Sequence, residues 1–98
     1  MCLYNVGVGF EWDPNKAREN FRKHGVLFST EAQAVFSDDL AITVTDDSEP
    51  GEERFVSIGL GGKARLLVVV YCYREDHIRM ISARPADPRE CREYEAQR

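Results

Sequence analysis

The chain is organised around one long apolar run, residues 66–73 (LLVVVYCY), which contains three successive β-branched valines. Such a run predicts a strand that is covered on both faces. A short polar interruption follows at residues 74–76, and a second β-rich segment then extends over residues 77–84. Two such segments joined by a short polar loop predict an antiparallel hairpin.

Two further strands are predicted before this hairpin. Residues 40–45 (LAITVT) are rich in β-forming side chains, and the turn signal Pro50-Gly51 follows them. Residues 61–63 (GGK) form the turn into the central strand. Three or four strands joined by short turns predict an antiparallel meander. Residues 54–60 alternate between two faces, with Val56, Ile58 and Leu60 on one and Phe55, Ser57 and Gly59 on the other.

A first helix is predicted from Pro14 to about His24. Asp13 is a favoured N-cap, and proline is favoured at the first helical position because its missing N–H would be unpaired there. Gly25 tolerates the left-handed conformation that ends many helices. One face of this helix carries apolar or aromatic residues at the spacing i, i+4, i+7, namely Ala17, Phe21 and His24.

A second, short helix is predicted after an apolar connector at residues 26–28. Ser29 or Thr30 would cap it, and Thr30 with Gln33 has the spacing of a capping box. Residues 37–39 (SDD) end it. Its apolar side is formed by Ala32, Val35 and Phe36.

A last helix is predicted from Pro88, with Asp87 as N-cap and Glu90 at the capping position. Cys91 and Tyr94 lie on the side that we expect to contact the rest of the domain. The order of elements therefore predicts one α+β domain over residues 1–98, with two N-terminal helices and a C-terminal helix on a small antiparallel sheet. Residues 1–9 would lead into a first strand, and we expect the helices mainly on one face.

The composition is that of a globular protein, with 43% hydrophobic and 31% charged residues in a chain of 98. No stretch approaches the roughly 20 apolar residues of a membrane span, and the first ten residues lack the basic start of a secretory signal. Three cysteines, an odd number without a CxxC pair, favour a reducing cytoplasm over a disulfide framework. The histidines and cysteines lack metal-ligand spacing, so we expect no metal and no other cofactor.

Charge is unevenly distributed along the chain. The net charge of −4 argues against a strongly nucleic-acid-binding surface. Residues 46–53 (DDSEPGEE), however, carry five acidic groups and no basic one, which leaves 13 basic and 12 acidic residues elsewhere. Residues 54–84 have six basic against two acidic groups, and residues 14–24 have four against one. This distribution permits a local phosphate-binding face. The acidic segment is a solvated loop, a mask for that face, or a site that binds a basic segment of a partner.

The candidate chemistry rests on basic side chains, because no nucleophile elbow, phosphate-binding glycine loop or zinc-binding helix motif is present. Arginine forks suit phosphate, and a histidine can move a proton near neutral pH. Together such groups can stabilise a pentavalent phosphate without a metal. The alternative is that these side chains are solvated or paired with Asp and Glu. The candidates are Lys23, His24, Arg65, Arg79 and Arg84, with Tyr94 as a polar aromatic group.

Four blocks of sequence closely resemble the BrnT toxin family of type II toxin–antitoxin systems. The resemblance covers about residues 10–94, and the W-D-P…K-H-G-V and I-S-A-R motifs in this order are specific to it. The blocks are FEWDPNKARENFRKHGVLF at residues 10–28, AVFSDD at 34–39, GEERFVSIG at 51–59 and IRMISARPA at 78–86.

The resemblance implies a RelE-like fold and a cytoplasmic ribonuclease toxin that blocks translation. It implies a BrnA-like antitoxin with a ribbon-helix-helix DNA-binding part, so that operator DNA would be bound only through the antitoxin. Enzymes of this kind cleave RNA without metal, by attack of the ribose 2′-OH on the adjacent phosphate. The family's basic positions fall here on Lys23, His24, Arg79 and Arg84, and less securely on Arg65.

The roles that follow are hypotheses. His24 would be the general acid or base, and Lys23, Arg79 and Arg84 would hold and neutralise phosphate. Arg65 and Tyr94 would bind substrate; Tyr94 or Trp12 could stack on a base, although Trp12 also fits a core position. The five-residue separation of Arg79 and Arg84 places them on opposite faces of a regular strand, so one shared cleft requires a bulge or a strand that ends before Arg84. A non-catalytic binding module or co-repressor of the same fold is the alternative.

Overall fold

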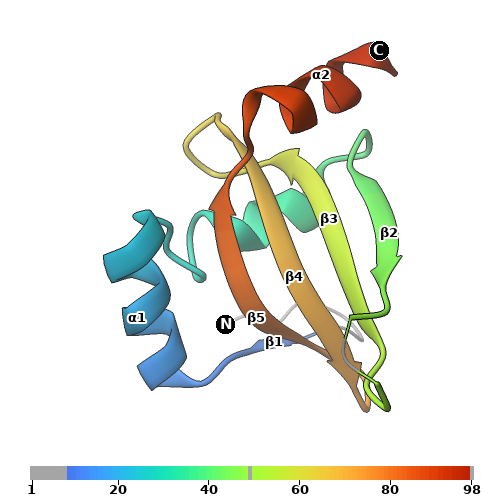
Figure 1. Ribbon diagram of the computed structural model, residues 1–98. Helices are drawn as coiled ribbons and strands as arrows, with labels where there is room; N and C mark the ends of the chain where they lie inside the picture. Colours follow the sequence, from blue (N-terminus) through green and yellow to red (C-terminus); the bar gives the residue numbers. More distant parts are fainter. Residues whose placement is uncertain (1–8, 49, 98) are drawn as a thin grey trace.

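The structure is a computed structural model that describes residues 9–48 and 50–97. It contains a five-stranded sheet, two α-helices and one short 3₁₀ helix (Figure 1). No helix in these ranges is both long and apolar enough to cross a bilayer. In chain order the elements are β1 (Gly9–Glu11), α1 (Pro14–His24), η1 (Ala32–Ser37), β2 (Ile42–Asp46), β3 (Arg54–Leu60), β4 (Leu66–Arg74), β5 (His77–Pro85) and α2 (Pro88–Ala96).

The strands lie in the order β1-β5-β4-β3-β2. The pairs β2–β3, β3–β4 and β4–β5 are antiparallel, which confirms the predicted meander and hairpin. The prediction of a purely antiparallel sheet is wrong, because β1 joins the other side of β5 in parallel. Three residues suffice for this pairing, and so short a strand has no pattern that specifies its partner. Of the predicted lead-in, residues 1–8 lie outside the described residues.

The sequence predicts that the helices lie mainly on one face of the sheet. This prediction is wrong, because η1 and α2 pack on opposite faces. η1 and the connector after α1 cover one face, called here the helix face, and α1 lies beside the edge of β5 that faces away from β4 (Figure 1). α2 packs across one end of the opposite face, called here the open face, where Tyr94 contacts Ile58 and Val68. β5 ends at Pro85 and α2 begins at Pro88, so only a short turn separates them. α2 therefore packs on the face from which Arg84 projects.

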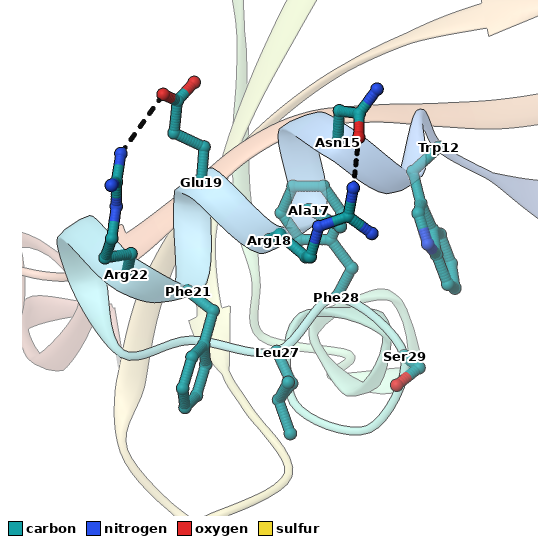
Figure 2. A pocket seen from close by; sticks show the side chains of 10 residues that line it. All are labelled: Trp12, Asn15, Ala17, Arg18, Glu19, Phe21, Arg22, Leu27, Phe28 and Ser29. Carbon is teal, nitrogen blue, oxygen red and sulfur yellow. Dashed lines mark hydrogen bonds and ion pairs between the residues drawn. The ribbon is translucent and has the colours of Figure 1, made fainter.

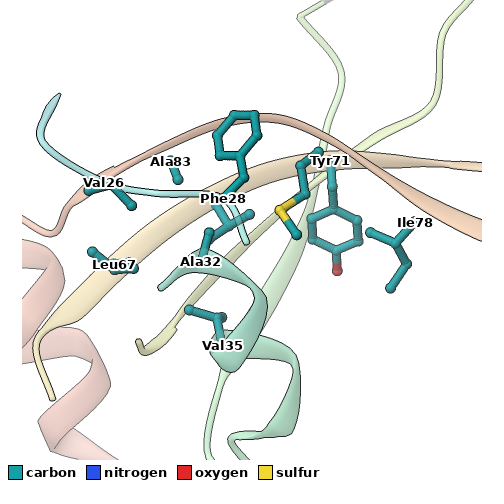
Figure 3. Close-up of a cluster of buried hydrophobic side chains, with 10 residues drawn as sticks. Val26, Phe28, Ala32, Val35, Leu67, Tyr71, Ile78 and Ala83 are labelled. Atoms are coloured by element: carbon teal, nitrogen blue, oxygen red, sulfur yellow. The ribbon is translucent and has the colours of Figure 1, made fainter. Parts of the chain in front are cut away.

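The main hydrophobic core lies between the sheet and η1 (Figure 3). Its side chains come from the connector, η1, β4 and β5, and Phe10 and Phe36 extend it with ring centroids 5.3 Å apart. Cys72 is buried, as expected for a small hydrophobic side chain, and it is a free thiol. The buried members are Val26, Phe28, Ala32, Val35, Leu67, Val69, Tyr71, Ile78, Met80 and Ala83.

The bounds of α1 agree with the prediction, but its buried face does not. The Asp13 carboxylate accepts a hydrogen bond from the Asn15 N–H at 2.8 Å, and Gly25 ends the helix at φ 70°. Asn20 is the buried residue, whereas Phe21 and His24 are exposed. The apolar spacing misplaced this face because the contact that holds α1 to the sheet is polar.

The predicted capping box of the second helix is also wrong. η1 is a 3₁₀ helix that begins after Glu31, and no side chain caps it. Its apolar residues are placed as expected, since Ala32 and Val35 are fully buried. The box predicted for α2 is confirmed: the Asp87 carboxylate accepts from the Glu90 N–H, and the Glu90 carboxylate accepts from the Asp87 N–H.

Candidate functional site

Arg79 and Arg84 lie on the open face of the sheet. In the β4–β5 ladder Cys72 pairs with Arg79, and Val68 pairs with Arg84. Antiparallel partners project from the same face, and Cys72 and Val68 are four positions apart on a regular strand. The register shifts between Val70 and Tyr71, whose partners are Ser82 and Met80, so Ile81 is an extra residue in β5. This β-bulge is the device that brings both arginines to one face.

Each of these arginines is held by a carboxylate. The Arg79 Nη1 donates to the Glu11 Oε2 at 3.0 Å, an ion pair that spans the parallel β1–β5 register. The Nη1 and Nη2 atoms of Arg84 each donate a hydrogen bond to one oxygen of the Glu90 carboxylate, at 2.9 and 2.8 Å. This bidentate hydrogen bond raises the pKa of the Arg84 guanidinium and lowers the pKa of the Glu90 carboxyl. Both guanidiniums are therefore fixed in direction, and the two side chains are still partly exposed, at 31% for Arg79 and 41% for Arg84.

Lys23 and His24 lie beside the edge of β5, whereas the two arginines project from its open face. They occupy the last turn of α1 and line a shallow hollow of about 210 Å³ together with Ile81 and Ser82. Ser82 is also the partner of Val70 on the open face, in the sequence interval between Arg79 and Arg84. The bulge is thus the point where the hollow of Lys23 and His24 meets the strand that carries the two arginines.

Asn20 fixes α1 in this position. Its side-chain amide donates to the Ala83 carbonyl oxygen at 2.9 Å and accepts from the Ala83 N–H at 3.0 Å. The same amide donates to the Val26 carbonyl oxygen at 3.3 Å. The side chain therefore pairs with the edge of β5 as a neighbouring strand would, and it sets where Lys23 and His24 stand relative to Ser82.

Arg65 is used within the fold. Its guanidinium donates to both oxygens of the Glu31 carboxylate, at 2.5 and 3.1 Å, and to the Gly25 carbonyl oxygen at 2.8 Å. The Glu31 side chain is 1% exposed, and its hydrogen bond to Arg65 lowers the pKa of the Glu31 carboxyl. These contacts tie the start of β4 to the segments before η1, away from the face that carries Arg79 and Arg84.

Tyr94 is 6% exposed and packs with Ile58 and Val68 beneath α2. Its hydroxyl donates to the Asp38 Oδ2 at 2.7 Å. A ring covered in this way has no free face on which a base could stack. Among the described residues, no three His, Cys, Asp or Glu side chains gather as a metal site would require.

Acidic side chains line a hollow beside Arg79 at the far end of the open face. Glu52 and Glu53 belong to the acidic segment, and with Glu11 and Glu75 they line a hollow of about 520 Å³ that also contains Arg74 and Arg79. The two carboxylates that directly hold the arginines, Glu11 and Glu90, were missed as site residues by sequence reasoning. Glu90 carried a signal for a cap alone, and Glu11 had no signal, because its pairing depends on the parallel strand β1.

A sequence model of a family described as "Ribonuclease toxin, BrnT, of type II toxin-antitoxin system" matches residues 12–90. Among solved structures, the ribonuclease toxin BrnT of Brucella abortus is similar in fold, with a TM-score of 0.63 and 21% sequence identity. The match covers 82% of this chain and 97% of that one. No curated protein sequence matches the chain. The matched span contains all six predicted site residues except Tyr94, and the chain belongs to the BrnT family of ribonuclease toxins of type II toxin–antitoxin systems.

Proposed function

We propose that this chain is a metal-independent endoribonuclease whose active site spans the bulged edge of β5. The observation that carries the proposal is the placement of Arg79 and Arg84 on one sheet face, with the Lys23 and His24 hollow at the bulge between them. The fork of each guanidinium matches the charge and the geometry of a phosphodiester.

In the proposed reaction the ribose 2′-oxygen attacks the adjacent phosphorus and forms a 2′,3′-cyclic phosphate. The bond from phosphorus to the 5′-oxygen breaks, and the leaving oxygen takes up a proton. His24 accepts the proton of the 2′-OH or donates the proton to the 5′-oxygen. Arg79, Arg84 and Lys23 stabilise the negative charge that develops on the non-bridging oxygens.

The carboxylates that hold the arginines support this assignment. An arginine has five N–H donors. Glu11 occupies one donor of Arg79, while Glu90 occupies two donors of Arg84 and the Pro85 carbonyl oxygen accepts from a third at 3.2 Å. The remaining donors can contact phosphate while the ion pairs keep each guanidinium in place. Preorganised donors of this kind need no rearrangement when charge develops in the transition state.

The partners follow from the family. A type II toxin has an antitoxin partner and an RNA substrate. We propose that the antitoxin is BrnA-like, that its ribbon-helix-helix part contacts operator DNA, and that this chain acts on RNA in the cytoplasm and thereby blocks translation. Arg65 and Tyr94, which the sequence placed in substrate binding, act instead through the stability of the fold in this proposal.

The deciding experiment combines growth and cleavage. Induced wild type should arrest a bacterial host, and His24→Ala and Arg79→Ala should relieve the arrest without loss of soluble protein. Purified wild type should cleave RNA in the presence of EDTA, leave a 2′,3′-cyclic phosphate end and spare a site with 2′-deoxyribose. Arrest that neither substitution relieves would move the chemistry elsewhere, and cleavage that EDTA abolishes would contradict the metal-independent mechanism.

A second function is a non-catalytic binding module or co-repressor of the same fold. It is favoured by the net charge of −4 and by the carboxylates at both arginines, which weaken the attraction of RNA. Soluble, folded wild type that neither arrests growth nor cleaves RNA, yet binds its antitoxin, would establish this alternative.

A further inference from the structure

A groove lies along the side of α1 that faces away from β5. It has a volume of about 730 Å³, within the range of roughly 300–1,000 Å³ that is typical of binding pockets. Its walls are α1 and the connector that follows it, and in Figure 2 Phe21 of α1 and Leu27 of the connector extend next to each other in the same direction. The lining residues that matter here are Trp12, Arg18, Phe21, Arg22, Leu27 and Phe28.

Two large apolar side chains stand exposed at this groove. Phe21 is 46% exposed and Leu27 is 40% exposed, although both adjoin residues that are buried. Below them Trp12 and Phe28 meet edge to face with ring centroids 6.0 Å apart, and Phe28 is 2% exposed. The floor is therefore part of the packed core, and the exposed pair forms an apolar wall without a cover in the described chain. Clustered exposed apolar groups of this kind mark interaction sites.

The rim of the groove is basic. Arg18 and Arg22 lie on it, and Arg22 pairs with Glu19 at 3.3 Å through side chains that are 77% and 56% exposed. An ion pair so exposed is screened by water and yields readily to a new carboxylate. The groove is lined by two basic residues, Arg18 and Arg22, against one acidic residue, Glu19, in a chain of net charge −4, so this surface attracts acidic groups that the rest of the molecule repels.

The shape of the groove selects a helix over an extended peptide. Added strands bind through the free backbone edge of a sheet, whereas the described walls of this groove are a helix and a connector. A partner must therefore bind by side chains. An amphipathic helix does so, with apolar residues at spacings of three and four toward the wall and charged residues toward the rim.

We propose that this groove is the docking site for an amphipathic helix of the antitoxin, with apolar residues against Phe21 and Leu27 and acidic residues facing Arg18 and Arg22. This inference rests on the proposed toxin function, since it requires an antitoxin. The groove and the hollow of Lys23 and His24 share Glu19 alone among the described residues that line them, and Phe21 and Leu27 do not line the hollow. The docked helix is thus an anchor that provides affinity without occupying the site of cleavage.

The test uses the purified antitoxin encoded beside the gene of this chain, with binding measured by calorimetry. Phe21→Glu and Leu27→Glu should each weaken binding by about 30-fold or more, the effect of a central contact residue at an interface. Val44→Glu is the matched control, because Val44 is 55% exposed on β2 and lies outside the groove, and its affinity should stay within about threefold of wild type. Arg22→Glu should weaken binding and reduce its dependence on salt.

Growth separates this inference from the function itself. The groove variants should arrest growth as wild type does, and co-expressed antitoxin should no longer rescue the host. Phe21→Ala and Leu27→Ala, with thermal melting for each, exclude misfolding as the cause. Groove variants that bind antitoxin within about threefold of wild type would overturn the docking site while leaving the ribonuclease untouched. Variants that lose arrest and RNA cleavage but keep antitoxin affinity would also overturn it, because the groove would then contact RNA.

Discussion

Arg79 and Arg84 project from the same face of the sheet although five positions separate them. On a regular strand an odd separation places two side chains on opposite faces. The extra residue Ile81 restores the parity, since Cys72 and Val68 are the respective partners of the two arginines. The same bulge allows Met80 and Ala83, three positions apart, both to enter the core on the helix face. One inserted residue therefore places core residues on one face and both arginines of the proposed phosphate site on the other.

Substitution of the arginines tests this arrangement directly. Arg84→Ala should reduce RNA cleavage by about 10²-fold or more, as loss of one preorganised donor does elsewhere. Arg84→Lys should recover only part of the rate, because lysine keeps the charge without the fork. Single-turnover cleavage of a labelled RNA gives the rates. Arg89→Ala, an exposed position on α2, is the control, and an equal loss there would show a general charge effect.

The elements of the fold that could be predicted are those specified by residues close together in the sequence. Asp13 with Pro14, Gly25, and Asp87 with Glu90 each specify a helix end through contacts within a few residues, and all of them are found. The β2–β5 meander follows in the same way from apolar runs joined by short turns. Such elements depend on neighbours in sequence, which a single sequence contains.

The unpredictable part depends on partners distant in sequence. No short sequence pattern predicts that β1 pairs in parallel with β5. The ion pair between Glu11 and Arg79, which are 68 residues apart, depends on that pairing and could not be predicted either. Asn20 did carry a signal, since a short amide one turn after Ala17 lies within the expected apolar face. The prediction of the buried face relied on Ala17, Phe21 and His24 and ignored this signal. In the structure the hydrogen bonds from Asn20 to Ala83 set the orientation of α1. For the candidate site, sequence supplied the basic residues, while the bulge and the carboxylates required the structure.

Arg65 should be a stability residue. Arg65→Ala leaves the Glu31 carboxylate, 1% exposed, without its cation. Removal of one partner of a buried pair costs about 3–5 kcal/mol, and we expect about 2–3 kcal/mol because Arg65 itself is partly exposed to water. In a domain of this size that lowers the melting temperature by about 10 °C or more. Thermal melting measures it. Cleavage per folded molecule should be unchanged well below that temperature, and a large loss would return Arg65 to substrate binding.

Asn20 should contribute about as much to the free energy of unfolding as an apolar core residue does. Asn20→Ala removes both hydrogen bonds to Ala83 and leaves buried backbone groups unpaired, at a cost of about 2–3 kcal/mol. Asn20→Asp keeps the acceptor for the Ala83 N–H and loses the donors, so it should also destabilise. Urea unfolding gives the free energies. Glu19→Ala, the exposed neighbour, should change the free energy of unfolding by less than about 0.5 kcal/mol. Equal stability of Asn20→Ala and Glu19→Ala would contradict the role of the amide.

The carboxylates of Glu90 and Glu31, which pair with Arg84 and Arg65, should make stability depend on pH in a defined direction. The hydrogen bond from Arg84 lowers the pKa of the Glu90 carboxyl below the ordinary glutamate value of 4.5, and Arg65 does the same for Glu31. A group whose pKa is lower in the folded state contributes stability that is fully present above its unfolded value. That stability is lost as the pH falls through the folded value. The melting temperature of wild type should therefore fall between about pH 5 and about pH 3.

Glu90→Gln isolates one of these groups. The glutamine oxygen can still accept the hydrogen bond from the Asp87 N–H, so the cap of α2 is kept while the charge toward Arg84 is removed. This variant should melt at a lower temperature than wild type at pH 7, and its melting temperature should fall less between pH 5 and pH 3. Glu93→Gln, on the exposed side of the same helix, should follow wild type. If Glu90→Gln and wild type lose stability in parallel on acidification, the Arg84–Glu90 pair does not hold the arginine with the strength that the proposed phosphate site requires.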